Sequence, residues 1–409
     1  MANILLLHAS AGSGHRSVAC AVAEALSATE NKSFSTVDVV DILSFGSPLF
    51  RLMYGKGYEF SAKYARWFVQ GVFSLTDHPW DQSRLVDLSE SLTAACVREV
   101  ATFMKENRVR VACCTHFLPV ALLCRMRRQG LYNGSIHVCV TDYDVHGFWY
   151  DPDVDLYHVA SQQAVERLTG WGIDPSRILL TGIPVRAGFA DSARQGAICA
   201  EDETDPLRSR ALKILLIASS LRLAECRQIL SELDEAHVPA DVDIVTGRNA
   251  RLYEELKQIY GQREGLGTVR MRLQGFVNNV DALMHASDVL ITKPGGITVT
   301  EALTAGLPML FVAPIPEHEV LNARILEEAG AGVSCFEKGT LGRQVRWFAL
   351  YPERLEQMRD NCLRHARPDA ASRIADQLLA AARMPAMLYT RPQAFRQEHL
   401  TELSGAAGQ

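Results

Sequence analysis

Short apolar runs alternate with helical segments twice along the chain, and this alternation constrains the fold more than any other feature. In the first half the apolar runs cover residues 3–10, 36–41, 109–115, 136–141, 156–160 and 178–182. In the second half they cover residues 213–218, 242–246, 289–292 and 309–313. Continuous apolar strands separated by helices are typical of parallel sheets covered on both faces. The sequence therefore predicts two doubly wound α/β domains.

A polar stretch at 187–210, acidic in its middle and without periodicity, separates the two halves. We expect an N-terminal domain at 1–187, a linker at 188–210, a second domain at 211–385 and a tail at 386–409. Open parallel sheets bind ligands at the carboxyl ends of their strands, so the two domains should face a shared cleft.

Charge and cysteine content exclude several classes of function. The 409 residues include 42 Lys and Arg and 47 Asp and Glu, which gives a net charge of −5. This balance does not support a general attraction to nucleic acid. The ten cysteines include no C-x-x-C pair, which argues against a thiolate metal site. The longest nearly apolar stretch, 111–124, is too short to span a bilayer.

The first candidate motif is the loop Gly12-Ser13-Gly14-His15, between a strand and a helix. Glycines let a ligand approach the backbone, and the start of a helix favours negative charge. The loop matches neither the dinucleotide fingerprint nor the phosphate-binding P-loop. Because the helix dipole favours a neutral imidazole, His15 is a candidate base. The alternative is a helix-start histidine bonded to backbone.

The second motif, TDYDVHGFW at 141–149, follows a predicted strand. Asp142 and Asp144 form a D-x-D pair, a spacing that can hold a divalent metal carrying a nucleotide diphosphate. The same spacing recurs at three other places in the chain, so it carries little weight. Aspartates that cap a loop are the alternative interpretation.

The third motif is the most informative: a strand runs into Pro294-Gly295-Gly296 and a helix follows. Free amides at that helix end can hold a phosphate without a metal. Glu301, near the first turn, can accept hydrogen bonds from a ribose diol. The alternative is a plain strand–turn–helix in which Glu301 complements the helix dipole.

Aromatic residues gather between residues 45 and 80, where ten of the chain's 31 occur. Four basic residues are interleaved with them: Arg51, Lys56, Lys63 and Arg66. This composition suits a membrane interface or a lipid pocket. A helical insertion packed on the N-terminal domain is the alternative.

Together these motifs resemble the glycolipid-forming glycosyltransferases that include plant monogalactosyldiacylglycerol synthases and bacterial processive diacylglycerol glucosyltransferases. The resemblance covers about residues 3–385 and is carried by the His8–His15 loop, TDYDVHGFW, DLYHVAS, TGIPVR, GFVNNVDALMHASDVLITKPGG, and EALTAGLP with Asn322. It implies the GT-B fold, which is shared with MurG-type N-acetylglucosaminyltransferases: two Rossmann-like domains that face a cleft.

The resemblance also implies a reaction. A hexose would pass with inversion from UDP-glucose or UDP-galactose to the hydroxyl of diacylglycerol or a related lipid, with no metal and no bound cofactor. The protein would be cytoplasmic and peripheral on the cytoplasmic face of the membrane, which it would contact through residues 45–80. A transferase with another acceptor, a UDP-sugar epimerase and a degenerate UDP-sugar-binding protein remain the alternatives.

Site residues follow from the matched motifs. His15 matches the family's proposed base, and Asp142 is a second candidate for that role. Ten further matches concern the donor: the diphosphate turn (Gly295, Gly296, Ile297, Thr298), the ribose acid (Glu301), the uracil-reading segment (Phe276, Val277), the arginine at the linker edge (Arg186), and the sugar loop (Glu319, Asn322).

The chain departs from the family pattern at two loops. Glycines usually follow the first strand of the C-terminal domain, whereas here the loop is Ala218-Ser219-Ser220-Leu221-Arg222. The family's Gly-Gln-Glu is Glu317-His318-Glu319, so His318 stands where a glutamine often reads sugar hydroxyls. We expect His318 to take part in sugar binding, and Asp142 and Asp144 to orient the acceptor or shape the loop rather than hold a metal.

Overall fold

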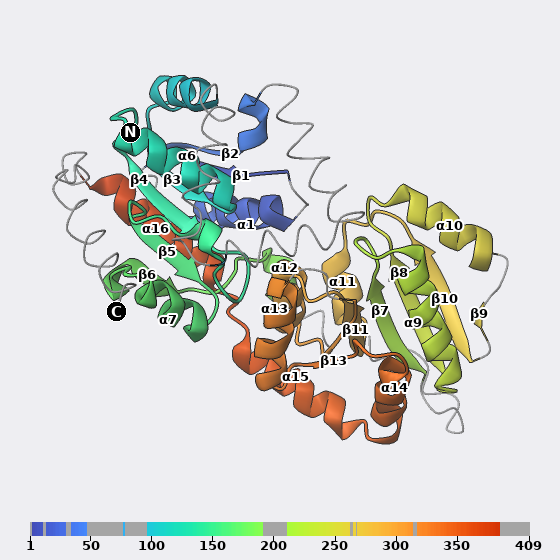
Figure 1. Ribbon diagram of the computed structural model, residues 1–409. Coiled ribbons are helices and arrows are strands. Elements are labelled where there is room, and N and C mark those ends of the chain that lie inside the picture. The colour runs from blue at the N-terminus through green and yellow to red at the C-terminus, as the bar shows by residue number, and fades with distance from the viewer. Residues whose placement is uncertain are drawn as a thin grey trace, which may run out of the picture.

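A computed structural model of the protein describes residues 2–10, 14–29, 34–46, 77, 96–190, 211–261, 265–266, 268–313 and 317–384. Two α/β domains lie side by side, and each is built on its own sheet (Figure 1). This arrangement confirms the predicted fold class.

The N-terminal sheet is parallel throughout and, over the described residues, has six strands. Their order is β2 (Phe34–Asp41), β1 (Ala2–His8), β3 (Val109–Cys114), β4 (Ser135–Cys139), β5 (Leu156–Val159) and β6 (Ile178–Leu180). In β1, Ile4 and Leu6 pack into one apolar cluster, whereas Leu5 and Leu7 pack into another. Both faces of this strand are therefore buried, as its continuous apolar run predicts.

The C-terminal sheet has seven strands among the described residues, in the order β13 (Gly332–Ser334), β12 (Met309–Phe311), β11 (Val289–Thr292), β7 (Leu212–Ile217), β8 (Ala240–Val245), β10 (Val269–Gln274) and β9 (Gly265–Leu266). The pairing of β9 with β10 is antiparallel, and the other pairings are parallel.

Helices cover both sheets (Figure 1). The N-terminal domain contributes α1 (Gly14–Ala28), a helix over residues 96–106, α6 (Phe117–Arg128) and α7 (Gln162–Gly170). The second half of the chain contributes α9 (Leu223–Glu235), α10 (Ala250–Tyr260), α11 (Val280–His285), α12 (Gly296–Thr304), α13 (Glu317–Glu328), α14 (Thr340–Leu350), α15 (Glu353–His365) and α16 (Ala370–Arg383).

Helix α16 returns to the N-terminal domain. It belongs to the predicted 211–385 domain by sequence, yet it packs against α1, β1 and β3 (Figure 1). Ile374 and Leu378 on α16 share one buried cluster with Ile4 and Val18 of the N-terminal domain and with Val299 of the C-terminal domain. The apolar core is thus continuous from one domain to the other.

The strand orders place the predicted motifs. In the N-terminal sheet the strand order reverses between β1 and β3, because β2 lies on one side of β1 and β3 to β6 lie on the other. In the C-terminal sheet it reverses between β7 and β11, because β8 to β10 lie on one side of β7 and β11 to β13 lie on the other. Ligands of doubly wound sheets bind at such switch points, beyond the carboxyl ends of the strands. His15 follows β1, and the Pro-Gly-Gly turn follows β11, so each motif lies at the switch point of its own domain.

Candidate functional site

His15 lies in the first turn of α1, and its ring orientation is fixed. Its Nδ1 is 2.7 Å from the backbone carbonyl oxygen of Thr115, at the end of β3. A carbonyl only accepts hydrogen bonds, so Nδ1 carries the proton and the lone pair resides on Nε2. The hydroxyl of Thr141 is 3.2 Å from the same Nδ1, and the hydroxyl of Thr115 donates back to the His15 carbonyl at 2.8 Å. This is the tautomer that a base acting through Nε2 requires.

A second histidine lies against His15. The His116 ring meets the His15 ring edge to face, with centroids 4.7 Å apart. Its Nδ1 accepts a hydrogen bond from the Leu118 amide and caps α6. Burial and, secondarily, the nearby His15 and His8 hold the pKa of His116 well below its usual range. His116 is therefore neutral at physiological pH and adds no positive charge beside His15.

The predicted diphosphate turn abuts the N-terminal domain. A Cβ on Gly296 would overlap the Thr141 carbonyl oxygen, whereas a Cβ on Gly295 would have no neighbour within 4 Å. A Cβ on Gly14 would overlap the end of the Ile297 side chain. The start of α1, which carries His15, thus meets the start of α12. The structure brings the candidate base and the predicted diphosphate turn together.

Asn322 links the same two loops from α13. Its Oδ1 accepts from the Tyr143 amide at 2.9 Å, and its Nδ2 donates to Asp142 Oδ1 at 3.2 Å and to the Pro294 carbonyl at 3.0 Å. The Asn322 side chain is fully buried. Asp142, the second candidate base, is therefore bonded to the opposite domain.

Tyr143 was not among the predicted site residues. Its ring is buried with residues of both domains, and its hydroxyl lies 3.1 Å from the hydroxyl of Thr300 on α12. The Thr300 hydroxyl donates to the Gly296 carbonyl at 2.6 Å, so Tyr143 is the donor in the bond between the domains. Because the two partners lie 157 residues apart, no local pattern could have revealed this contact.

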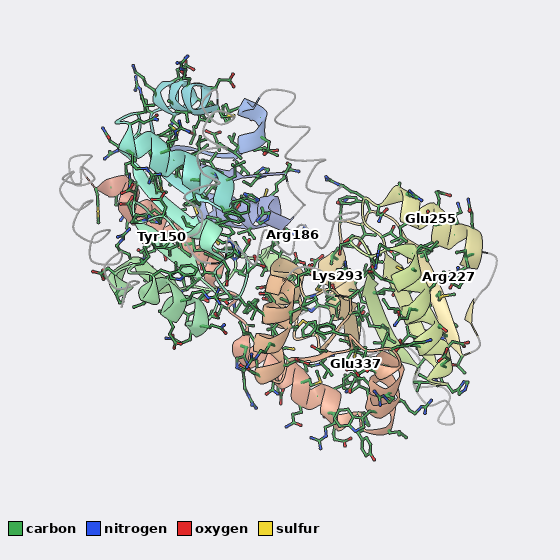
Figure 2. All side chains as sticks on the ribbon, viewed as in Figure 1. Tyr150, Arg186, Arg227, Glu255, Lys293 and Glu337 are labelled. Atoms are coloured by element: carbon green, nitrogen blue, oxygen red, sulfur yellow. The ribbon has the colours of Figure 1, made fainter. Side chains whose placement is uncertain are left out.

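Glu301 lies partly buried in α12, where the resemblance predicts the ribose-binding acid. Burial raises the pKa of its carboxyl to about 7; Arg186 opposes the increase and Asp281 adds to it. Figure 2 places Arg186 where the two domains meet, and Lys293 inside the C-terminal domain. The Arg186 guanidinium also lies 5.6 Å from the centre of the Phe189 ring.

The predicted uracil-reading segment follows β10. The Phe276 side chain is 59% exposed, and the Arg248 guanidinium lies 5.2 Å from the centre of its ring. Arg248 follows β8, the neighbour of β10, so both side chains lie at the carboxyl edge of the sheet. Val277 is partly buried against the core. Arg248 was not predicted, because a lone arginine in a polar loop carries no local signal.

The remaining predicted residues lie on α13 or in the stretch at 45–80. Glu319 lies in the first turn of α13, and the His318 side chain is outside the described residues. The aromatic-basic stretch at 45–80 is described only up to residue 46 and at Asp77. Arg167 binds that Asp77 carboxylate through both oxygens, at 3.0 and 3.1 Å.

The Asp144 carboxylate is also bonded. It forms an ion pair with Arg167 at 3.1 Å and accepts from the Val145 amide at 2.8 Å. Burial raises the pKa of Asp144, which Arg167 opposes. Over the described part of the chain, no group of three or more His, Cys, Asp or Glu side chains could hold a metal ion.

The loop at 218–222, which departs from the family pattern, ends at Arg222. The Arg222 guanidinium forms an ion pair with Glu225 at 2.6 Å.

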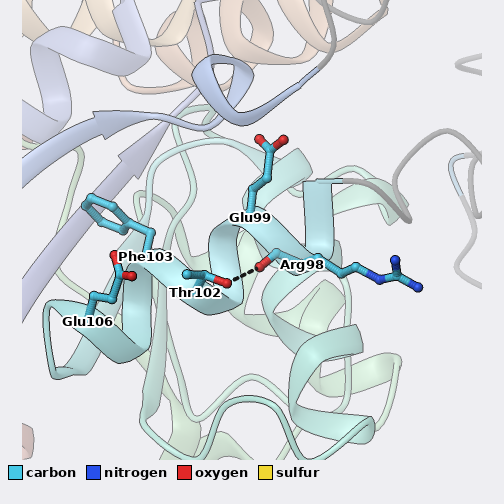
Figure 3. Close-up of a pocket in the computed structure, with 5 residues that line it drawn as sticks. All are labelled: Arg98, Glu99, Thr102, Phe103 and Glu106. Atoms are coloured by element: carbon cyan, nitrogen blue, oxygen red, sulfur yellow. Dashed lines mark hydrogen bonds between the residues drawn. The ribbon is translucent and has the colours of Figure 1, made fainter.

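A shallow depression of about 330 Å³ lies elsewhere, on the helix of residues 96–106 (Figure 3). Its lining consists of Arg98, Glu99, Thr102, Phe103 and Glu106. It contains none of the predicted site residues, and its side chains do not converge on a shared point (Figure 3). We do not assign it to the site. Within the described residues, every helix is too short or too polar to cross a membrane.

Comparisons with known proteins agree with this arrangement. The family model of monogalactosyldiacylglycerol synthase matches residues 15–185, and that of the glycosyltransferase family 28 C-terminal domain matches residues 222–374. MurG from Acinetobacter baumannii has a similar structure, with a TM-score of 0.56 at 16% identity over 93% of this chain and 100% of that one. The structure of MnaA from S. aureus with UDP gives a TM-score of 0.58 at 13% identity over 92% of this chain and 96% of that one.

Two relatives carry the same name, processive diacylglycerol beta-glucosyltransferase. The protein from Bacillus licheniformis is 27% identical over 366 residues, covering 88% of this chain and 90% of its own. The protein from Bacillus subtilis is 33% identical over 210 residues, about half of each chain. The two matched family models divide at the predicted linker, in the same order as the two domains. The chain is therefore a glycosyltransferase whose N-terminal half resembles the monogalactosyldiacylglycerol synthases and whose C-terminal half resembles the family 28 glycosyltransferases, and over most of its length it is similar to processive diacylglycerol glucosyltransferases.

Proposed function

We propose that this enzyme transfers glucose or galactose from the corresponding UDP-sugar to the hydroxyl of diacylglycerol, with inversion at the anomeric carbon. One observation carries the proposal: a histidine whose lone pair is fixed on Nε2 lies where the start of α1 meets the start of α12. Relatives named for transfer of glucose to diacylglycerol support this choice of substrates.

In this mechanism, His15 removes the proton from the acceptor hydroxyl through Nε2 while that oxygen attacks the anomeric carbon. The Thr115 carbonyl accepts from Nδ1–H and stabilises the imidazolium that forms. The C–O bond to the UDP oxygen breaks, and the amides at the Gly295–Thr298 turn stabilise the negative charge on the leaving diphosphate. The Glu301 carboxylate accepts hydrogen bonds from the ribose hydroxyls, and Arg186 beside it favours the ionised carboxylate. Phe276, Val277, His318 and Glu319 complete the donor site.

The proposed diphosphate site is made of backbone amides, so the reaction is expected to need no divalent metal. Incubation with UDP-glucose or UDP-galactose and diacylglycerol vesicles, followed by mass analysis of the lipids, tests the substrates. Glycosylated diacylglycerol should form with and without EDTA. If EDTA abolishes product and Mg²⁺ or Mn²⁺ restores it, the amide site is insufficient and a metal at Asp142 and Asp144 becomes the better explanation. Absence of lipid product with either sugar would contradict the proposed acceptor.

The acceptor is a lipid, so we also propose that the enzyme works at the cytoplasmic face of the membrane through residues 45–80. Exchange of Arg66 and Trp67 together for alanine should lower sedimentation with anionic vesicles while leaving UDP affinity intact. Added salt should weaken binding of the unaltered protein, because exposed charges are screened beyond about 8–10 Å at physiological ionic strength. Equal sedimentation of the double variant and the unaltered protein would assign the segment to internal packing.

A further inference from the structure

The Asn322 side chain makes its hydrogen bonds to groups within the protein. A carboxamide has two N–H donors, and those of Asn322 serve the Asp142 carboxylate and the Pro294 carbonyl. Its oxygen accepts from the Tyr143 amide. The side chain is fully buried, so a sugar hydroxyl could bind it only after these contacts break. This arrangement fits a group that joins two loops rather than one that reads a substrate.

Tyr143 is held by each of its polar groups. Its amide donates to Asn322, its carbonyl accepts from the Ser161 hydroxyl, and its hydroxyl donates to Thr300. The ring itself is 7% exposed. A residue of the N-terminal domain is thus anchored in the first turns of α12, next to the predicted diphosphate turn.

We propose that Asn322, Tyr143 and Thr300 form a joint that positions the two halves of the active site. This proposal deepens the proposed function, and its expected effect on kcat rests on that function. His15 is bonded to Thr141, two residues before Tyr143, and Pro294 precedes the turn that receives the diphosphate. The joint therefore sets the distance between base and donor. In this proposal, these contacts persist whether or not a donor is bound. All three are positioning residues that do not touch the substrate.

The first test compares Asn322→Ala with Asn361→Ala. The control asparagine donates its amide to the Gly330 carbonyl within the C-terminal domain. We expect kcat to fall about ten- to hundredfold in Asn322→Ala, because small misplacement of reacting groups costs that much. The UDP dissociation constant from calorimetry should not change. Asn361→Ala should keep both values.

Amide hydrogen exchange tests the joint independently of enzyme activity. In the unaltered protein the Tyr143 amide should exchange slowly with and without UDP, and in Asn322→Ala it should exchange faster in both states. Fast exchange in the free protein that UDP slows would show a contact made only on donor binding, and would overturn the proposed joint.

The second test is a double-mutant cycle of Tyr143→Phe and Thr300→Val, with Thr304→Val as control. Thr304 lies one turn further along α12 and donates to the Thr300 carbonyl within the helix. The two changes at the joint should be non-additive in kcat and in thermal stability, whereas Tyr143→Phe and Thr304→Val should be additive. Both changes keep the shape of the side chain, so this cycle remains available if Asn322→Ala fails to fold.

The outcomes separate this inference from the proposed function. If kcat and UDP affinity both fall in Asn322→Ala, the residue belongs to the donor site and the joint is overturned. Additive effects of Tyr143→Phe and Thr300→Val overturn it as well. If no lipid is glycosylated by the unaltered protein, the proposed function fails, while exchange and stability still decide whether the joint exists.

Discussion

At the scale of single residues, one proton on the His15 ring determines which nitrogen can act as a base. The Thr115 carbonyl holds that proton on Nδ1. Removing the imidazole with His15→Ala should therefore lower kcat by about 10²- to 10⁴-fold, the usual contribution of a general base. UDP affinity should stay unchanged. The assay is initial-rate kinetics on vesicles.

His365 offers a matched control, since it is exposed on α15 and its Nδ1 lies 2.9 Å from the Asn361 carbonyl. His365→Ala should retain full activity. Normal turnover by His15→Ala would instead transfer the role of base to Asp142.

Glu301 gives a prediction about stability and pH. Burial raises its pKa from an ordinary value of 4.5 to about 7, so the folded state binds this proton more tightly than the unfolded state. The free energy of unfolding should therefore fall as pH rises from about 4.5 to 7 and then level off. The loss is at most about 3.5 kcal/mol, because one pKa unit corresponds to about 1.4 kcal/mol.

Glu301→Gln removes the titration, and its unfolding free energy should vary less over this pH range than that of the unaltered protein. Urea unfolding at several pH values measures the difference. Glu301→Gln should also bind UDP more weakly at pH 8, where the native carboxylate is ionised and accepts from the ribose. Parallel stability profiles for the two proteins would show that Glu301 does not titrate in this range.

His15 and Glu301 are candidates from the sequence because each lies within a short motif beside a strand end. Tyr143, Thr300 and Arg248 are not, because their contacts depend on partners that the fold brings close from distant parts of the chain. The donor-binding roles of Phe276 and the other matched residues remain predictions, and the contacts of Asn322 favour the joint instead. The structure adds their contacts, and UDP affinities of variants at these positions test their function.

At the scale of elements, the two glycines of the Pro-Gly-Gly turn should behave differently. A Cβ on Gly296 would overlap the Thr141 carbonyl oxygen. This oxygen belongs to the backbone, so it cannot move away by a change of side-chain rotamer. Gly296→Ala should therefore destabilise the protein by about 1–3 kcal/mol, the usual cost of overpacking. Thermal unfolding with and without UDP measures this loss.

Gly295→Ala is the matched comparison. A Cβ there meets nothing within 4 Å, and the backbone φ of −72° suits alanine. Its stability should be unchanged, yet UDP should bind more weakly because the new methyl group occupies space at the predicted diphosphate site. Unchanged UDP affinity would place the diphosphate elsewhere.

Most strands were predictable because they are short, continuous apolar runs. Strand β10 (Val269–Gln274) was missed because Arg270 and Arg272 interrupt its apolar residues. The structure pairs these arginines with Asp241 and Asp243 on the neighbouring strand β8, at 2.7 and 2.6 Å. Cross-strand ion pairs of this kind have no signature within a single strand.

At the scale of the whole molecule, α16 should make the two domains unfold together. Leu378 on α16 is fully buried in the cluster that both domains share. Leu378→Ala should lower the free energy of unfolding by about 2–5 kcal/mol, as for other large core truncations. Differential scanning calorimetry should still record a single transition at a lower temperature. Two transitions, of which only one shifts, would show that the domains are independent.

Leu350→Ala serves as the control, because its side chain is 67% exposed. Its transition temperature should match that of the unaltered protein. The position of α16 was not predictable from sequence: its apolar face indicates that it is buried, but not against which domain.

The return of α16 also affects the order in which the protein can fold during synthesis. The apolar surface of α1, β1 and β3 that α16 covers is made early, whereas α16 is made after the whole C-terminal sheet. At about 5–20 residues per second, the ribosome needs roughly 13–50 s to add the residues between β3 and α16. During that interval the nascent N-terminal half presents an uncovered apolar face. It is then a substrate for chaperones and for premature pairing with other nascent chains, so slower translation of the second half should lower the yield of folded enzyme.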